Sequence, residues 1–297
     1  MKAFYSDTFA FPLPGTHRFP LGKYGQLRQR IVADGLIPPL ELYVAPPATD
    51  EQLRLAHQED YLRRTIEGRL DVKEVRRIGL PWSPELVTRA RHSTGGTLAA
   101  CRAALEEGLA VNLAGGTHHA GYDRGQGYCL FNDVVIAARV AGRRAVVIDC
   151  DVHQGNGTAA LARDDPGIFT FDVYNESNFP LHKEPSDLDV PLADGTGDED
   201  YLAVLEAGLA RALDLARAEL AFYLAGADPY EGDSLGRLAL SKAGLAARDR
   251  LVLERCRAAG LAVVVLMAGG YGRRVEDTVD IHLATVRTAV EMASIWK

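Results

Sequence analysis

From residue 110 onward, the apolar positions follow a strand, loop, helix rhythm. Short runs of valine, isoleucine and leucine recur there, and segments with apolar residues at helical spacing separate them. Continuous apolar strands between amphipathic helices are typical of a buried, mostly parallel sheet. The pattern therefore predicts an α/β fold, a three-layer α/β/α sandwich around a mostly parallel central sheet.

The rhythm also predicts where the individual elements lie. We expect strands at residues 110–113, 145–149, 168–172, 220–225 and 261–268. We expect helices at residues 133–141, 157–162, 201–218, 242–259 and 280–295. The aperiodic stretch 173–197 is predicted to be a loop that forms part of the wall of a site, because long loops without secondary structure are often functional.

The N-terminal third has a weaker pattern. Its first forty-odd residues are rich in Pro and Gly and predict loops, one short strand and a helix over residues 24–33. Thr49 is expected to cap one further helix, whose apolar face comprises Leu53, Ala56, Tyr61 and Leu62. A helix over residues 84–108 is expected to direct inward Leu86, Ala90, Leu98 and Leu105.

Composition limits the class of protein. The 297 residues contain no linker or low-complexity tract, so we expect one domain, residues 1–297. A net charge of −7 argues against a nucleic-acid partner. The four scattered cysteines suit reduced, buried thiols, and neither a signal peptide nor a membrane span is apparent, so we expect a cytoplasmic protein without membrane contact. The oligomeric state is left open.

Four apolar runs end in residues that can do chemistry. In open α/β sheets, ligands bind in the crevice beyond the carboxyl ends of the strands. If the four runs are parallel strands, that crevice receives His118, His119, Asp149, Asp151, His153, Asp228 and Tyr271. This set suits a metal-assisted hydrolase.

The second run ends in a metal-binding pattern. Asp149, Asp151 and His153 alternate, so all three can face one side while Cys150 and Val152 face the other. A catalytic zinc usually takes three protein ligands and keeps a position for water. One carboxylate and the imidazole supply two ligands, and Asp228 is the best candidate for the third.

The adjacent imidazoles of His118 and His119 suit proton transfer at neutral pH, because histidine titrates near that range. Buried imidazoles need orienting partners, and Asp149 is available for one ring and Asn156 for the other. The Tyr271 hydroxyl is a candidate donor to the oxyanion of a tetrahedral intermediate.

Three further residues are expected on the substrate side of the crevice. Gly270 would let the loop that carries Tyr271 approach the substrate or move. Gly127 and Tyr128 closely follow the histidine pair, so the aromatic ring of Tyr128 is a candidate wall for a narrow apolar channel to the metal.

These residues together resemble the histone deacetylase family, which shares the arginase/deacetylase fold. The matching segments are Gly-Gly-Thr-His118-His119-Ala, Asp149-Cys-Asp151-Val-His153-Gln-Gly-Asn156-Gly-Thr, Gly226-Ala-Asp228-Pro and Gly269-Gly270-Tyr271. The stretch that begins at Asp233 and the segment from His57 to Leu62 are also similar. In order and spacing, the resemblance covers nearly the whole chain.

The resemblance implies roles for these residues. It implies that Zn²⁺ is bound by Asp151, His153 and Asp228. It implies that His119 acts as general base and then as acid, and that His118, paired with Asp149, assists electrostatically. Tyr271 would stabilise the oxyanion, and Tyr128 would line the acyl tunnel. A structural K⁺ near the Asp149–His153 segment is also implied, with Asp172 as a neighbouring ligand.

One residue departs from the family pattern. Asn156 stands where many members carry Asp, and the segment around it looks most like class IV histone deacetylases and their bacterial relatives. An amide supplies no charge, so His119 should be a weaker base than in a paired Asp–His arrangement. The acidic limb of activity should then appear at lower pH.

The activity implied is that of a zinc-dependent amidohydrolase that removes acetyl or longer acyl groups from lysine ε-amines of a peptide or protein. The alternative within the family is a deacetylase of small acylated amines such as acetylpolyamines. A binuclear manganese ureohydrolase of the arginase type and a non-catalytic binder of acylated ligands are more distant alternatives. Two oxygen ligands and one nitrogen ligand also suit Fe²⁺. Acyl length, natural substrate and native metal are left open.

Overall fold

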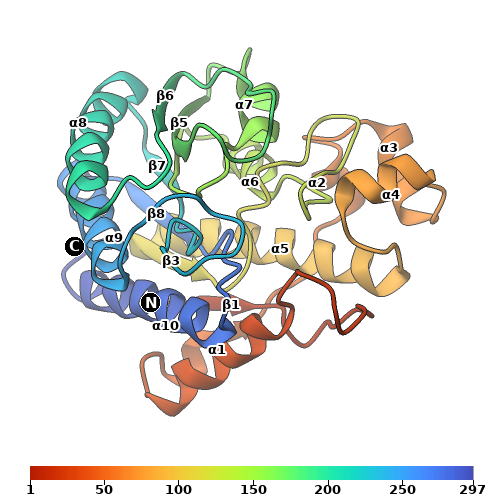
Figure 1. Ribbon diagram of the computed structural model, residues 1–297, viewed down its shortest axis with the longest axis horizontal. Coiled ribbons are helices and arrows are strands. Elements are labelled where there is room, and N and C mark those ends of the chain that lie inside the picture. Colours follow the sequence, from red (N-terminus) through yellow and green to blue (C-terminus); the bar gives the residue numbers. More distant parts are fainter. Residues whose placement is uncertain (297) are drawn as a thin grey trace.

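A parallel sheet runs through the centre of the computed structural model, which describes residues 1–296 (Figure 1). In chain order, its strands are β1 (Ala3–Tyr5), β2 (Leu42–Val44), β3 (Leu109–Asn112), β4 (Ala145–Asp149), β5 (Ile168–Asn175), β6 (Leu188–Leu192), β7 (Leu220–Leu224) and β8 (Ala262–Leu266). Across the sheet the order is β2-β1-β3-β8-β7-β4-β5-β6, and every pairing is parallel. The predicted α/β fold is confirmed.

Helices cover both faces of the sheet (Figure 1). One face carries α1 (Gly22–Ala33), α8 (Asp198–Ala216), α9 (Lys242–Ala258) and α10 (Val275–Ala293). The other face carries α5 (Pro84–Glu107), α6 (Asp133–Ala141) and α7 (Asn156–Ala162). Three short helices lie beside α5 on this second side: α2 (Asp50–Leu53), α3 (Glu59–Ile66) and α4 (Val72–Ile78). A 3₁₀ turn at Pro39–Glu41 precedes β2.

The central strands are apolar on both faces because both faces are covered. In β4, Val146 and Ile148 enter the core beneath α8 and α9, whereas Ala145 and Val147 enter the core beneath α5 and α6. Side chains that alternate along a strand point to opposite faces, so a strand covered twice must be apolar throughout. This burial explains the continuous apolar runs of the sequence.

The prediction of a single helix after Thr49 is wrong. Thr49 does cap a helix, but α2 ends at Leu53 and α3 begins only at Glu59. Between them, the Gln58 amide donates to the carbonyl of Tyr122 (2.7 Å), and the His57 ring contacts the carbonyl of Gly121 (2.8 Å). These long-range bonds draw the chain out of the helix, which a periodic pattern does not register.

Three other elements were absent from the prediction: a second short N-terminal strand, since both β1 and β2 form where one strand was expected, and α4 and β6. Helix α4 begins at a capping box in which Asp71 and Glu74 bond each other's backbone amides, a signal that the sequence contains. Strand β6 lies within the stretch 173–197, all of which was expected to be loop, and β5 also extends into that stretch. Leu188, Val190 and Leu192 do alternate, but β6 is an edge strand with a proline and only one neighbour, so its pattern is weak.

Side-chain placement differs from expectation at one helix position. Leu86 and Leu98 of α5 are buried and Ala90 is partly buried, but Leu105 is 40 % exposed rather than inward. It lies in the last turn of α5, where Ala103 and Ala104 are buried, so Leu105 stands on the exposed side of the helix. All four cysteines are free and buried, as expected. Among the described residues, no helix combines the length and apolarity needed to cross a bilayer.

Candidate active site

The sheet order brings the four chemistry-bearing loops together. Strands β3, β8, β7 and β4 are consecutive neighbours, and all of them run parallel. Their carboxyl ends therefore meet at one edge of the sheet, which is where the crevice of an open α/β sheet lies. The loops after these strands carry the histidine pair, Tyr271, Asp228 and the Asp151–His153 segment.

Asp151, His153 and Asp228 form a compact buried group, called here the metal-ligand group. One candidate ligand atom from each residue lies within 4.8 Å of the others. Strand β4 ends at Asp149, yet the alternation continues beyond it, since Cys150 and Val152 enter the core. The expected separation of polar and apolar side chains therefore holds in the loop.

The chemistry of the metal-ligand group fits a divalent cation. Asp228 Oδ1 accepts a bond from the Val152 amide (3.0 Å), whereas Oδ2 has no hydrogen-bond partner although it is buried. Burial, followed by the charge of Asp151, raises the pKa of the Asp228 carboxyl to about 7. Two buried carboxylates that repel each other beside an imidazole are groups that a cation would bind and stabilise.

Glycine at position 269 makes this approach of carboxylates to backbone feasible. A Cβ atom at Gly269 would lie 1.9 Å from Asp228 Oδ2 and 2.5 Å from Asp151 Oδ2. The Gly269 amide itself donates to Asp151 Oδ2 (2.7 Å). A side chain at this position would displace the metal-ligand group.

His118 is paired with a carboxylate. Its Nδ1 donates to Asp149 Oδ2 (2.7 Å), and both side chains are buried. Burial opposes the charged imidazolium, but Asp149 and Asp151 outweigh this effect and raise the pKa of His118 to about 9. The ring is therefore charged at neutral pH.

His119 has an amide partner instead. Its Nδ1 donates to Asn156 Oδ1 (2.8 Å), and its ring centroid lies 4.1 Å from that of His118. Burial, followed by His118 and His153, holds the pKa of His119 well below its ordinary value, and the bond to Asn156 offsets this only in part. This ring is neutral and can accept a proton. The two adjacent imidazoles thus differ in charge, since that of His118 is protonated and that of His119 is neutral.

Tyr271 is held by residues that the sequence analysis did not single out. The Tyr271 amide donates to Asp233 Oδ2 (2.6 Å), and Ser234 Oγ donates to the Tyr271 carbonyl (2.6 Å). The preceding Gly270 has a φ of +141°, a conformation that favours glycine. Burial, followed by Asp151 and Asp228, raises the pKa of the Tyr271 hydroxyl well above its ordinary value, so it stays a donor.

An outer channel leads to the metal-ligand group. Gly127, Tyr128, Phe179, Leu235 and Tyr271 are among its lining residues, together with His119 and His153. The Phe179 ring stands edge-on to His119, with centroids 4.9 Å apart. Phe179 was not predicted individually, although the stretch 173–197 was expected to form part of a site wall. Two aromatic rings that the channel lining shares, those of Tyr128 and Phe179, therefore border the approach to His119 and His153.

A second set of buried polar residues lies behind the histidine pair and is called here the framework cluster: His57, Thr97, Thr117, Asn132 and Asp133. Asp133 accepts bonds from the amides of Gly116 (3.0 Å) and Thr117 (2.7 Å), which hold the backbone just before His118. No sequence signal distinguished Asp133 from an ordinary residue of the first helical turn.

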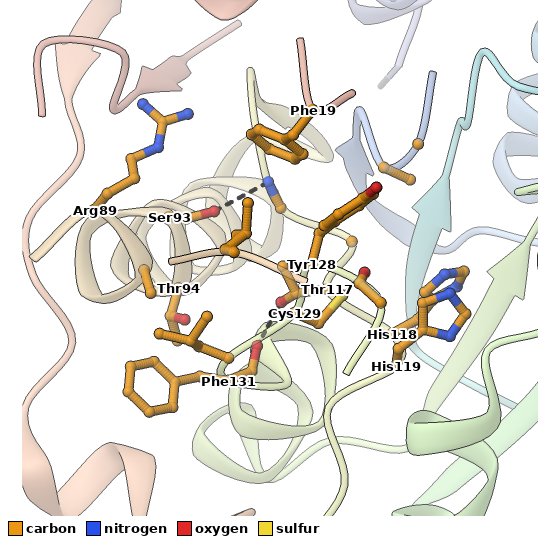
Figure 2. Close-up of a pocket in the computed structure, with 18 of the residues that line it drawn as sticks. Phe19, Arg89, Ser93, Thr94, Thr117, His118, His119, Tyr128, Cys129 and Phe131 are labelled. Carbon is orange, nitrogen blue, oxygen red and sulfur yellow. Dashed lines mark hydrogen bonds between the residues drawn. The ribbon is translucent and has the colours of Figure 1, made fainter. Parts of the chain in front are cut away.

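An inner cavity opens behind the metal-ligand group (Figure 2). Its lining includes Asp151, His153 and Tyr271. Figure 2 places Arg89 and the histidine pair on opposite sides, with Ser93, Thr94 and Cys129 between them. Arg89 was missed by the sequence analysis, although it stands three residues after Leu86 on the predicted inner side of a helix.

Asp172 lies beside Asp149, its register partner in the neighbouring strand. Its Oδ2 accepts a bond from the Gly155 amide (2.7 Å), while the buried Oδ1 has no partner. Burial, followed by the charge of Asp149, raises the pKa of Asp172 well above its ordinary value. A structural K⁺ at this position stays a prediction.

Comparison with known proteins identifies the family. A profile described as "Histone deacetylase domain" matches residues 17–286. An uncharacterized protein of Picosynechococcus sp. is 42% identical over 290 residues, which cover 96% of this chain and 97% of that protein. The histone deacetylase-like amidohydrolase of Pseudomonas aeruginosa is 31% identical over 272 residues, 83% of this chain and 70% of that protein.

Solved structures agree on the fold. The crystal structure of an HDAC homolog from Aquifex aeolicus superposes with a TM-score of 0.81 over 99% of this chain and 84% of that chain, at 23% identity. Histone deacetylase 2 of Arabidopsis thaliana is 29% identical over 93% of this chain and 77% of its own length. The chain therefore belongs to the histone deacetylase family, and it is a deacetylase-type hydrolase that acts on amide bonds.

Proposed function

We propose that this hydrolase removes acyl groups from the ε-amine of lysine side chains, with Zn²⁺ in the metal-ligand group. The observation that carries the proposal is the outer channel, whose aromatic walls Tyr128 and Phe179 lead directly to His119, His153 and Tyr271. The aromatic and aliphatic residues of this lining suit the aliphatic stem of lysine, and the amide would then lie at the metal-ligand group.

The residues of the chain divide the reaction between them. A cation bound by Asp151, His153 and Asp228 would polarise the amide carbonyl and make the attacking water more acidic. His119, neutral and oriented by Asn156, accepts the proton of that water. The Tyr271 hydroxyl donates a hydrogen bond to the oxyanion.

Collapse of the tetrahedral intermediate needs a proton on the leaving amine. A histidine of the pair supplies it, and the charged His118, oriented by Asp149, stabilises negative charge that develops beside it. The products are a carboxylate and a free amine.

The test is a substrate panel combined with metal analysis. Acetyl- and hexanoyl-lysine peptides are compared with acetylspermidine, and the metal content of protein purified without added metal is measured. We expect one metal ion per chain and higher kcat/KM for the peptides. Tyr271→Phe should lower kcat/KM by roughly 10²- to 10³-fold at unchanged metal content, whereas the exposed Tyr122→Phe should not.

Other outcomes favour the alternatives. A higher kcat/KM for acetylspermidine would identify small acylated amines as the substrates. Two metal ions per chain would favour the arginase-type reaction, although residues 1–296 contain a single group of three or more close His, Cys, Asp or Glu side chains that could hold a metal. Tight binding of acetyl peptides without turnover would indicate a non-catalytic binder.

A further inference from the structure

The inner cavity contains a buried arginine without a partner. Arg89, on α5, is only 6 % exposed, and it forms no hydrogen bond or ion pair with any residue in the range 1–296. Its Nη1 is among the buried nitrogen atoms that lack a partner. Burial lowers the pKa of the guanidinium, and Tyr24 and Asp7 offset this only in part. An unpaired buried charge is costly and calls for a ligand or a function.

A second buried cation lies close to Arg89. Lys23 Nζ donates to the backbone carbonyls of Ala268 (3.4 Å) and Gly270 (3.2 Å) and lies 5.4 Å from the centre of the Tyr271 ring. Within the described residues it has no carboxylate partner. Its Nζ lies 5.1 Å from the centre of the Tyr24 ring, and Arg89 Cζ lies 4.6 Å from the same centre. The Asp7 carboxylate is occupied by Arg28 (2.8 Å). Both cations therefore lie against the Tyr24 ring, and Arg89 is the one that lines the cavity.

The cavity joins Arg89 to the reaction centre. Its lining includes Asp151, His153 and Tyr271, and also Tyr24 and Arg89. Between them the lining is apolar or small, with Phe19, Leu86, Ala90 and Gly116 among its residues. A wholly apolar acyl chain would fill the space but leave Arg89 unpaired.

We propose that Arg89 binds the terminal carboxylate of a dicarboxylic acyl group in the inner cavity, as distinct from the carboxylate released by hydrolysis. The guanidinium fork pairs with both oxygens of a carboxylate, and removal from water strengthens the pair. The inference rests on the proposed deacylase function, because hydrolysis places an acyl group beside the metal-ligand group, and Asp151 and His153 of that group line the same cavity.

Matched acyl peptides separate the two sources. Succinyl-lysine is compared with butyryl-lysine, and glutaryl-lysine with pentanoyl-lysine, so that each pair differs by a terminal carboxylate in place of a methyl group. Wild type, Arg89→Gln, Arg89→Lys and the control Arg102→Gln are measured. Arg102 is exposed on the same helix, so its variant loses the same charge without touching the cavity. Inhibition constants of free acetate, pentanoate and glutarate are measured at constant ionic strength.

If the carboxylate belongs to the acyl group, Arg89→Gln lowers the ratio of glutaryl to pentanoyl kcat/KM by about tenfold or more, and Arg89→Lys lowers it less. If Arg89 binds only the product, this ratio is unchanged and the inhibition constants of the free carboxylates rise about tenfold in Arg89→Gln. An unchanged ratio overturns the proposal, whether or not the inhibition constants change.

Thermal stability distinguishes a carboxylate-binding arginine from a purely structural one. Removing a costly charge should leave the Tm of Arg89→Gln unchanged or higher, so a lower Tm with unchanged selectivity and inhibition would assign Arg89 a structural role and overturn the proposal.

If wild type hydrolyses no acyl peptide, the proposed function fails. Calorimetric binding of glutarate and pentanoate to wild type and Arg89→Gln then decides the inference: a loss of affinity for glutarate relative to pentanoate in the variant supports it, and an unchanged ratio of affinities overturns it.

Discussion

The framework cluster and the metal-ligand group are both buried and polar, but they differ in how their hydrogen bonds are satisfied. In the framework cluster, His57 bonds the carbonyl of Gly121 through Nδ1 and the amide of Asn132 through Nε2. Both oxygens of Asp133 accept backbone amides and threonine hydroxyls. In the metal-ligand group, Asp228 Oδ2 has no hydrogen-bond partner and lies 3.3 Å from His153 Nδ1, and Asp151 and Asp228 repel each other.

The framework cluster therefore contributes stability to the folded protein, and the metal-ligand group awaits a ligand. A buried polar group that is bonded within the protein stabilises one conformation, whereas an unsatisfied group costs free energy until something binds it. Changes in the framework cluster should therefore lower the free energy of unfolding, and changes in the metal-ligand group should lower activity. Substitutions in each region test that division.

The largest effect is expected at the metal-ligand group. Asp228→Ala should lower kcat/KM by at least about 10³-fold and metal affinity by more than about 100-fold, because one of three ligands is lost. The midpoint of urea unfolding without metal should be unchanged or higher, since the removed carboxylate is the one whose charge is disfavoured by burial and by Asp151. Activity, metal titration and urea unfolding are measured beside the exposed control Asp164→Ala. A variant that keeps activity and metal would contradict the assignment.

Asp133→Ala should instead act mainly on stability. It leaves the amides of Gly116 and Thr117 without an acceptor, which should lower the free energy of unfolding by about 3 kcal/mol in urea titrations. Asp133→Asn keeps one acceptor oxygen and should cost less. If the alanine variant unfolds like wild type, the framework cluster is not the stabilising region.

The His57 ring predicts a loss of stability in acid. Burial lowers the pKa of His57 from 6.5 to about 4, while the bond from its ring to Gly121 opposes this. The folded state therefore holds a neutral ring, and below pH 6.5 the unfolded state binds the extra proton. The contribution is complete above pH 6.5 and is lost progressively towards pH 4, by about 2 kcal/mol at pH 5.

This loss is measured as the difference in unfolding free energy between pH 7 and pH 5. His57→Gln cannot titrate, so its dependence on pH over this interval should be weaker than that of wild type by about the same amount. Equal slopes in the two proteins would rule out His57 as the source.

The smallest effect is expected within the histidine pair. Asn156→Asp would place a carboxylate on His119 Nδ1, stabilise the imidazolium and raise the pKa of His119. Because the base must be neutral, the acidic limb of the pH–rate profile should move to higher pH, by about one unit. Asn156→Ser serves as an uncharged control. An unmoved limb would mean that Asn156 does not set the basicity of His119.

Local patterns predicted much of the fold and of the candidate site. The apolar runs that became β3, β4, β7 and β8 are continuous because both faces of the sheet are covered, so their signal is strong. The residues that follow them came together because parallel strands end at one edge. Features that depend on partners distant in sequence escaped prediction. One is the break between α2 and α3 at His57, whose ring bonds to Gly121 and Asn132.

The sequence by itself determined the layered fold, the family and the set of groups that can do chemistry, because period, spacing and residue type are local properties of the chain. Only the tertiary structure decided the charge states of His118 and His119, the hydrogen bonding of Asp133, and the isolation of Arg89 in the inner cavity. Burial and the nearest charge set these properties, and both arise from segments that are distant in sequence and adjacent only after folding.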